Sequence, residues 1–311
     1  MDPTLQIATA RDGTRLAWTS TGAGGPPVML VDGIGCAGYV WRHLRPALSD
    51  HRRVIHWNYR GHGHSEAPRD RDRVTVDDCV DDLFAVLDAA GEQEALLAGH
   101  SMGVQIALEA HRRAPSRVKG LVLLCGAPGH PIDTFRDSGL LRAAFPFARA
   151  AVERWPDLAR NLIRAVVPTE VALELALTFE VDRTRVARED LARYLDDLSR
   201  VDPVLFTRLL HSAGEHDTTD HLPEVDVPTL VVAGERDTFT PMRLSVAMHQ
   251  AIAGSELLVL PGGTHVGPLE HPARVAERVL AFLARHADAP RPPRRPAPLR
   301  AARRGRRAGP R

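Results

Sequence analysis

The feature that most constrains the fold is a serine held between two glycines where an apolar run gives way to a helical pattern. The pentapeptide Gly99-His100-Ser101-Met102-Gly103 follows the apolar residues 95–98, which predict a buried strand, and precedes residues 104–113, which predict a helix. A sharp turn from strand to helix strains its central residue and requires small neighbours, which the two glycines supply. The strain lifts the serine hydroxyl out of the sheet, so Ser101 is a candidate nucleophile.

A serine hydroxyl is a weak nucleophile unless a base takes its proton, so a histidine and an orienting carboxylate are required. Asp237 follows the predicted strand of residues 228–233, and His265 follows the predicted strand of residues 256–260. Doubly wound sheets place their sites at the carboxyl ends of strands, and position therefore selects these two residues. The amide of Met102 is a candidate oxyanion donor, because the N-terminus of a helix favours negative charge.

Short apolar runs alternate with helical patterns along most of the chain. Residues 28–31 suit a strand buried on both faces, and residues 76–90 carry one apolar helical stripe. The alternation predicts an α/β fold with a mostly parallel, doubly wound sheet. It lapses over residues 127–222, where we expect an inserted helical cap at the carboxyl edge of the sheet. Residues 140–151 and 171–179 of this cap are candidates for lining a pocket, although packing is the commoner use of such clusters.

The net charge is distributed unevenly along the chain. Residues 287–311 hold nine Arg and one Asp, a net charge of +8, and the whole chain carries +1, which leaves −7 for the rest. A body of that charge lacks the basic surface that nucleic acid requires. The Arg- and Pro-rich tail has no apolar periodicity and is expected to be disordered. The expected domains are a core of residues 1–126 and 223–286, a cap of residues 127–222 and a tail of residues 287–311.

The three cysteines indicate the compartment. Cys36, Cys79 and Cys125 are far apart and in no metal-ligand spacing, which favours buried thiols in a reducing environment. The N-terminus lacks a basic segment followed by an apolar one, and no apolar run reaches membrane-spanning length. We therefore expect a soluble, cytoplasmic protein that has no membrane partner.

Together these motifs resemble the α/β-hydrolase superfamily, in its serine-nucleophile members with a helical cap. Residues 99–103 look like the nucleophile elbow of that family, residues 234–237 look like the segment with its acid, and His265 looks like its base. The likeness covers about residues 5–286. It implies the α/β-hydrolase fold and a hydrolase that works with a catalytic triad.

Two further segments carry the resemblance. Residues 58–65 are similar to the family's loop after its fourth strand, and residues 32–35 are similar to its oxyanion loop. The resemblance implies a second oxyanion donor, the backbone amide of Ile34. Two residues depart from the family pattern: Asp32 stands where the family usually has His, and Asn58 stands where it usually has Asp. Neither position makes or breaks bonds, so the departures concern the electrostatics near Asp32.

Two other motifs point to cofactors. Residues 33–38 spell the dinucleotide fingerprint G-x-G-x-x-G after a predicted strand, but the next strand ends in Trp57-Asn58, where a ribose-binding acid is required. His62-Gly63-His64 suggests a metal pair, but the adjacent Ser65-Glu66 adds no histidine. We therefore expect no nicotinamide, no flavin and no metal.

The nucleophile limits the reaction class. Family members that attack saturated carbon use Asp, because a serine would form an ether that water does not release. Ser101 therefore predicts attack on an acyl carbon, with His265 as base and Asp237 orienting it. The expected substrate is a small molecule with a hydrophobic acyl or ring portion, such as an ester or lactone. Carbon–carbon hydrolysis, acyl transfer and cofactor-free peroxidation stay open, as does a ligand-binding receptor without turnover.

Overall fold

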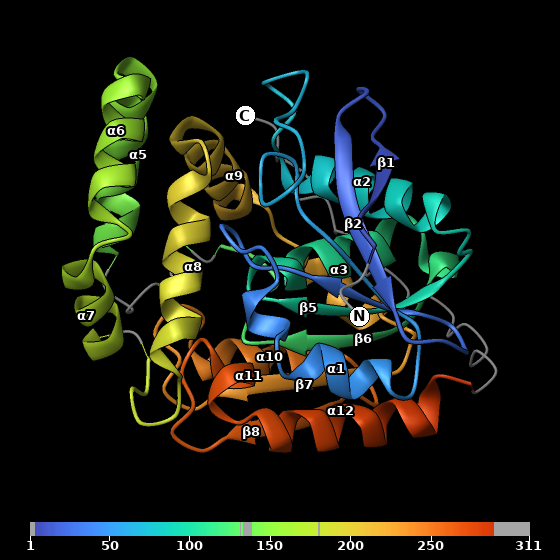
Figure 1. The fold of residues 1–311 in the computed structure, drawn as a ribbon. Coiled ribbons are helices and arrows are strands. Elements are labelled where there is room, and N and C mark those ends of the chain that lie inside the picture. Colours follow the sequence, from blue (N-terminus) through green and yellow to red (C-terminus); the bar gives the residue numbers. More distant parts are fainter. Residues whose placement is uncertain (1–3, 131, 133–138, 180, 289–311) are drawn as a thin grey trace, which may run out of the picture.

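One eight-stranded sheet forms the centre of the computed structural model, which describes residues 4–130, 132, 139–179 and 181–288 (Figure 1). The strands are β1 (Gln6–Thr9), β2 (Arg15–Thr21), β3 (Val28–Val31), β4 (Val54–Trp57), β5 (Ala95–His100), β6 (Val118–Leu124), β7 (Thr229–Gly234) and β8 (Glu256–Leu260). Their order across the sheet is β1-β2-β4-β3-β5-β6-β7-β8. Strands β4, β3, β5, β6, β7 and β8 run parallel, whereas β2 pairs antiparallel with β1 and β4. The mostly parallel sheet predicted from the sequence is confirmed.

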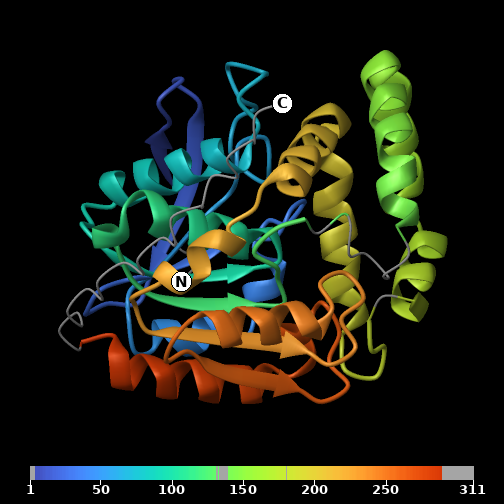
Figure 2. The same ribbon diagram turned by 180° about the vertical axis from the view of Figure 1, so that it is seen from behind.

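Helices cover both faces of this sheet (Figures 1 and 2). The core helices are α1 (Leu44–Ser49), α2 (Val76–Ala89), α3 (Met102–Arg113), α10 (Met242–Ala251), α11 (Gly267–Glu270) and α12 (Pro272–His286), with short 3-10 helices at Tyr39–Trp41, Pro115–Arg117 and Thr219–Glu224. Apolar stripes of α2, α3 and α10 pack on one face, and those of α1 and α12 pack on the other. Strands β3, β4 and β7 are buried at every position, because helices cover them on both sides.

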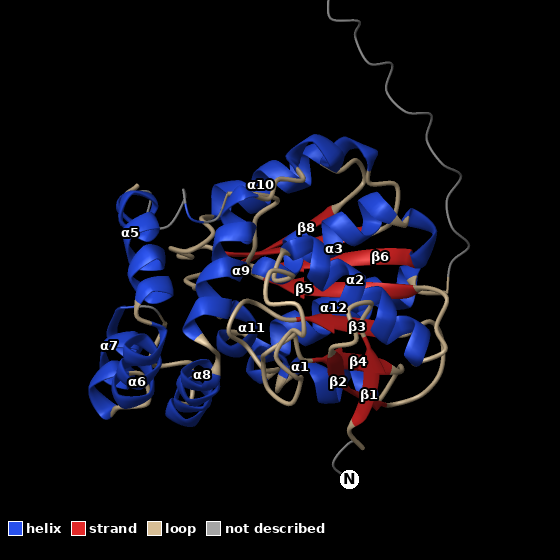
Figure 3. Cartoon of the chain, turned by 90° about the horizontal axis from the view of Figure 1, so that it is seen from above, coloured by secondary structure: helices blue, strands red, loops and turns tan. Residues whose placement is uncertain are grey.

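The segment between β6 and β7 is helical where the structure describes it. Its helices are α5 (Leu140–Arg154), α6 (Pro156–Val166), α7 (Glu170–Phe179), α8 (Arg188–Arg200) and α9 (Pro203–Glu215). α8 and α9 lie next to the core, and α5, α6 and α7 form an outer layer beyond them (Figures 1 and 3). Within the described ranges, no helix is both long enough and apolar enough to cross a bilayer. All but residues 287 and 288 of the expected tail lie outside the described residues.

The two apolar clusters considered for the pocket lie in the outer layer. Phe147 of α5 is 78% exposed and Val171 of α7 is 70% exposed, whereas Leu173 and Leu177 pack against α8. The cavity at Ser101 takes its cap side chains from α8, α9 and the segment after β6 instead. Helical periodicity marks an apolar face, but it does not say which neighbour the face contacts.

Candidate active site

Ser101 connects the end of β5 to the start of α3. Its backbone has φ 56° and ψ −119°, a conformation that residues with a side chain rarely adopt. A Cβ on Gly99 would lie 2.3 Å from the carbonyl oxygen of Gly103, and a Cβ on Gly103 would lie 2.2 Å from that of Val31. Any larger residue at either position would push the strand and the helix apart, so the turn depends on both glycines.

Two loops bring a histidine and an aspartate to this serine. Asp237 follows β7, and His265 follows β8. His265 Nε2 lies 2.9 Å from Ser101 Oγ, and His265 Nδ1 lies 3.0 and 3.1 Å from the carboxylate oxygens of Asp237. These are hydrogen-bond distances. The arrangement allows the serine hydroxyl to pass a proton to Nε2 while Nδ1–H donates to the carboxylate.

Asp237 is 5% exposed and is held by the residues that follow it. Its Oδ1 accepts the backbone N–H groups of Phe239 and Thr240, both at 2.9 Å, and its Oδ2 accepts the Thr240 hydroxyl at 2.8 Å. Burial by itself raises the pKa of Asp237, but His265 and Thr240 outweigh it and hold this pKa below its usual value. The Phe239 ring also stacks on His265, with centroids 4.9 Å apart. The sequence analysis did not identify Phe239 or Thr240. The only sequence signal for them is their position shortly after Asp237.

His100, the residue before Ser101, is buried. Its Nε2 lies 2.9 Å from the backbone carbonyl oxygen of His265. Burial lowers the pKa of His100 to about 4, so the ring is neutral at pH 7. Its Nδ1 has no hydrogen-bond partner among the described residues, which agrees with a proton on Nε2 that is donated to that carbonyl. His100 thus ties the His265 loop to the strand before Ser101, a contact that sequence reasoning missed.

The loop after β3 lies across the same turn. A Cβ on Gly33 would lie 3.1 Å from Ser101 Cβ, so the two backbones approach closely. Ile34 and Met102 both line the cavity at Ser101. Within the described part of the chain, neither backbone amide has a hydrogen-bond acceptor. Both amides are therefore available to a negatively charged oxygen at this position.

The motif of residues 58–65 supports the oxyanion loop. The Gly35 N–H donates to His62 Nε2 at 3.3 Å, and His62 Nδ1 contacts the Arg60 carbonyl oxygen at 3.1 Å. Burial lowers the pKa of His62, which keeps Nε2 available as an acceptor. The Tyr59 hydroxyl also donates to the Asp32 carbonyl oxygen. His62 therefore serves the loop through its neutral ring.

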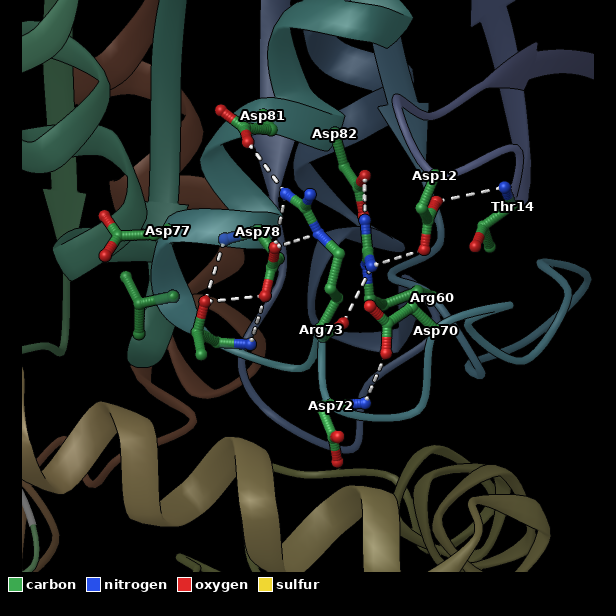
Figure 4. A network of polar contacts seen from close by, with 12 residues as sticks. Asp12, Thr14, Arg60, Asp70, Asp72, Arg73, Asp77, Asp78, Asp81 and Asp82 are labelled. Atoms are coloured by element: carbon green, nitrogen blue, oxygen red, sulfur yellow. Dashed lines mark hydrogen bonds and ion pairs between the residues drawn. The ribbon is translucent and has the colours of Figure 1, made fainter.

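A buried arginine anchors this motif to the core (Figure 4). Arg60 donates from Nε and Nη2 to the carboxylate of Asp82, at 2.8 and 2.6 Å, and from Nη1 to Asp12 at 3.2 Å. It also reaches the Arg73 carbonyl oxygen at 2.7 Å, and the Arg73 side chain binds Asp78 near the start of α2. A buried guanidinium with all these acceptors fixes the position of its loop.

Both departures from the family pattern are hydrogen-bonded. Asp32 is buried; its Oδ1 accepts the Trp41 indole N–H at 2.6 Å, and its Oδ2 contacts His56 Nε2 at 2.8 Å. Asn58 Oδ1 accepts the His64 backbone N–H at 3.0 Å. The carboxylate at position 32 is thus held by two buried side chains.

Glu270 links the cap to the loop that carries His265. This buried carboxylate accepts the Thr264 N–H at 2.6 Å and the Thr264 hydroxyl at 2.7 Å. It also accepts the N–H of Asp182, in the segment between α7 and α8, at 2.8 Å. Sequence reasoning missed Glu270, because no motif within one sequence reveals a contact with residues 88 positions away.

A cavity of about 180 Å³ opens at Ser101. Most of its lining is apolar, from the core residues Ile34 and Phe239 and from the cap residues Ile132, Tyr194, Phe206 and Leu210. The site therefore combines a polar reacting centre with an apolar binding surface.

Neither of the other two motifs builds a cofactor site in the described structure. No group of three or more His, Cys, Asp or Glu side chains there is arranged to hold a metal ion. The glycines of residues 33–38 lead into the short 3-10 helix Tyr39–Trp41, whereas a dinucleotide fingerprint leads into a long helix whose N-terminus binds the pyrophosphate.

Known proteins match the chain in sequence and in structure. The sequence model of the alpha/beta hydrolase fold family matches residues 26–272. The chain is 31% identical over 293 residues to 2-hydroxymuconate semialdehyde hydrolase of Pseudomonas sp. strain CF600, an alignment that covers 89% of this chain and 93% of that one. It is also 31% identical over 277 residues to the dihydrolipoyllysine-residue acetyltransferase component of the acetoin cleaving system of Pseudomonas putida, with 88% and 68% covered.

Among solved structures, a thermophilic esterase from Thermogutta terrifontis superposes with a TM-score of 0.75 at 26% identity, covering 91% of this chain and 99% of that one. A hydrolase from Pseudomonas aeruginosa superposes with a TM-score of 0.73 at the same identity, with 91% and 99% covered. The chain therefore belongs to the α/β-hydrolase fold family and is a serine hydrolase.

Proposed function

We propose that the protein hydrolyses a carboxylic ester, a lactone or a related acyl compound through Ser101, His265 and Asp237. The observation that carries this proposal is the 2.9 Å contact between Ser101 Oγ and His265 Nε2, with Asp237 on the other ring nitrogen. As the serine oxygen attacks the acyl carbon, His265 takes its proton, and Asp237 stabilises the charged imidazole. The Ile34 and Met102 amides bind the oxyanion of the tetrahedral intermediate.

A second proton transfer completes the formation of the acyl-enzyme. His265 returns the proton to the leaving oxygen, which departs as an alcohol and leaves an acyl group on Ser101. Water then attacks the acyl carbon and gives a proton to His265, which passes it to the Ser101 oxygen as the acyl bond breaks and the acid is released. Loss of one oxyanion donor typically lowers kcat by about a hundredfold, so the position of the Ile34 amide matters as much as that of a side chain.

The cavity supports a small apolar acyl group or a compact ring. Its volume of about 180 Å³ is below the range of about 300–1,000 Å³ that is usual for small-molecule pockets, which favours a small acyl portion. A larger group would have to displace Tyr194, Phe206 or Leu210 of the cap. We therefore expect the best substrates to be short-chain esters or small lactones.

Carbon–carbon hydrolysis is the second candidate function. It is favoured by the 31% identity to 2-hydroxymuconate semialdehyde hydrolase, which extends over 93% of that enzyme. The same serine and oxyanion donors can release a carbon leaving group once it is protonated. Product analysis separates the two candidates, since an ester gives an alcohol and an acid, whereas a cleaved diketone gives a ketone and an acid.

Labelling with a fluorophosphonate probe tests the proposal directly. We expect one covalent adduct on Ser101 and none in the Ser101→Ala variant. Hydrolysis rates for esters with acyl chains of rising length, and for lactones of rising ring size, then define the substrate class. Absence of an adduct on a folded wild-type protein would favour a receptor that binds ligands without turnover.

A small-molecule partner and a cytoplasmic location belong to the same proposal. The small enclosed cavity supports the first, and the three buried thiols agree with the second. Fractionation of expressing cells tests the location.

A further inference from the structure

A second, larger cavity lies between α8 and the core loops that follow β3 and β4. Its volume is about 610 Å³. Tyr39 lines this cavity and Tyr194 lines the cavity at Ser101; their rings stack with centroids 4.7 Å apart. The stacked pair therefore stands between the two cavities. We call the larger one the polar cavity, because charged and polar side chains of α8, of α1 and of the loop after β4 line it.

Most charged groups around the polar cavity are matched in pairs. Three arginines face three aspartates there: Arg42 with Asp190, Arg193 with Asp197, and Arg200 with Asp196. Two of these pairs are direct ion pairs, and the third acts through the attraction of Arg193 on Asp197. Burial raises the pKa of Asp197, which further limits the negative charge at this position. The three pairs together contribute little net charge.

Arg45, on the core side of this cavity, forms no direct ion pair with any of the described residues. Its half-buried guanidinium donates from Nη2 to the Thr19 hydroxyl at 2.9 Å and from Nε to the Thr21 hydroxyl at 3.4 Å. Burial lowers the pKa of Arg45, and the attraction of Asp32 offsets this only in part. A half-buried guanidinium whose charge is offset only in part has lost some of its hydration, and a bound anion would recover part of that free energy.

Neighbouring groups add donors on the same wall. Asn58 uses its Oδ1 as an acceptor for the His64 backbone N–H, which leaves its NH₂ group as a donor. The His64 ring also lines the polar cavity. Among the described residues of the core, the buried carboxylate of Asp32 follows β3 and is already bonded to Trp41 and His56. Donors rather than acceptors therefore dominate the core side of the cavity.

We propose that the polar cavity binds a small oxyanion, a carboxylate or a phosphate compound, with Arg45 as its principal ligand. The planar guanidinium presents paired N–H donors that match two oxygens of one anion. Arg193 reaches the same cavity from the cap helix α8. The anion thus connects core and cap at a site separate from the one at Ser101, and its binding stabilises the folded chain.

Isothermal titration calorimetry of the full chain with sodium phosphate, and separately with sodium succinate, tests this site. Each titration is compared with sodium chloride at matched ionic strength. We expect saturable one-to-one binding of at least one of the two anions. The anion that binds with the higher affinity shows whether the site prefers a phosphate or a carboxylate compound. Arg45→Met should weaken this binding by at least about tenfold, which is the effect of losing one charge-assisted hydrogen bond. Arg193→Ala should weaken it severalfold.

Two controls separate this site from others. Arg15→Met removes an exposed arginine that pairs with Glu66, and it should leave the affinity unchanged. Ser101→Ala should also leave it unchanged, because the anion does not occupy the apolar cavity. If Arg45→Met does not fold, Arg45→Lys keeps the charge but loses the paired donors and should still weaken binding severalfold. Absence of saturable binding in the wild type, unchanged affinity in the Arg45 variants, or loss of binding in Ser101→Ala would each overturn the proposal.

Discussion

Asp237 shows how a single residue sets the geometry of a reacting centre. Two of its donors are backbone N–H groups directly after it, from Phe239 and Thr240, and a third is the Thr240 hydroxyl. The donors of its own loop are therefore enough to orient the Asp237 carboxylate, without the hydrogen bond to His265. An imidazole placed against this carboxylate keeps its proton on Nδ1 and presents a bare Nε2 to Ser101.

Asp237→Asn tests this role. The side-chain oxygen of asparagine can still accept the two backbone N–H groups, but its NH₂ group would face His265 Nδ1. The imidazole would then carry its proton on Nε2 and could not accept one from Ser101. We expect kcat for a short-chain ester to fall by about three to four orders of magnitude with the fold intact, measured by steady-state kinetics and circular dichroism. Asp220→Asn, at an exposed ion pair with Arg112, is the control; an equal loss in both variants would contradict this account.

His100 makes stability depend on pH. Its pKa is about 4 in the folded chain, against 6.5 for an ordinary histidine, and burial lowers the pKa of His62 in the same direction. At a pH between these two pKa values, the unfolded chain binds a proton at His100 that the folded chain does not bind. The free energy of unfolding therefore falls as the pH drops from 6.5 towards 4. The contribution of His100 is of the order of 3 kcal/mol. Urea unfolding at pH 7, 5.5 and 4.5 measures it.

His100→Gln should flatten this pH dependence, since glutamine does not titrate. His51→Gln removes an exposed histidine and should leave the slope as in the wild type. If stability were constant between pH 7 and 4.5, or if both variants behaved alike, burial of a neutral His100 would not be the cause.

At the scale of elements, strands and core helices follow from the sequence, but their ends do not. The sequence predicts a strand over residues 95–98 and a helix over residues 104–113, whereas β5 extends through His100 and α3 begins at Met102. The Ser101 N–H donates to the Leu124 carbonyl oxygen of β6 at 3.1 Å, so the ladder of the sheet continues into the turn. Pairing with a neighbouring strand, which local propensity does not contain, decides where β5 ends.

The residues of the candidate site likewise fall into two groups, those that the sequence predicts and those that only the folded chain reveals. Ser101, Asp237 and His265 are predictable because each follows a recognisable strand at the carboxyl edge of the sheet. Thr240, His100 and Glu270 act through contacts that only the folded chain creates, and their residue types carry no motif. The layers of the cap are also outside the reach of periodicity, since an apolar stripe on α5 has the same pattern whether it faces a pocket or solvent.

Glu270 is the element-scale link between α11, the cap and the His265 loop. Glu270→Gln keeps the size of the side chain but replaces one acceptor with a donor, which would face the N–H of Thr264 or of Asp182. We expect the His265 loop to shift and kcat to fall on the order of tenfold, with a smaller effect on KM, in steady-state kinetics. Glu277→Gln, on the exposed face of α12, is the matched control. A rate equal to that of the wild type would show that Glu270 does not position the loop.

At the scale of the whole molecule, core and cap contribute different parts of one site. The sheet edge supplies the candidate reacting groups, and α8 and α9 contribute Tyr194, Phe206, Leu210 and Ala213 to the apolar lining. Groups from two different chain segments can therefore set reaction type and substrate size separately, although α9 packs into the core cluster. A substitution in the cap should change which acyl group is preferred without changing the chemistry at Ser101.

Leu210→Ala tests whether the cap sets the preference for acyl groups independently of the chemistry at Ser101. It removes three carbon atoms from the cap wall of the cavity and no hydrogen bond of Ser101, so the preferred acyl chain should lengthen by about three carbons. Each additional methylene buried there is worth about 0.8 kcal/mol, or about a fourfold gain in kcat/KM. Leu158→Ala, the same substitution at a 65% exposed position on α6, should leave the preference unchanged. If the two variants and the wild type share one optimal chain length across a series of esters, α9 does not bound the acyl site, and the substrate occupies another part of the interface between cap and core.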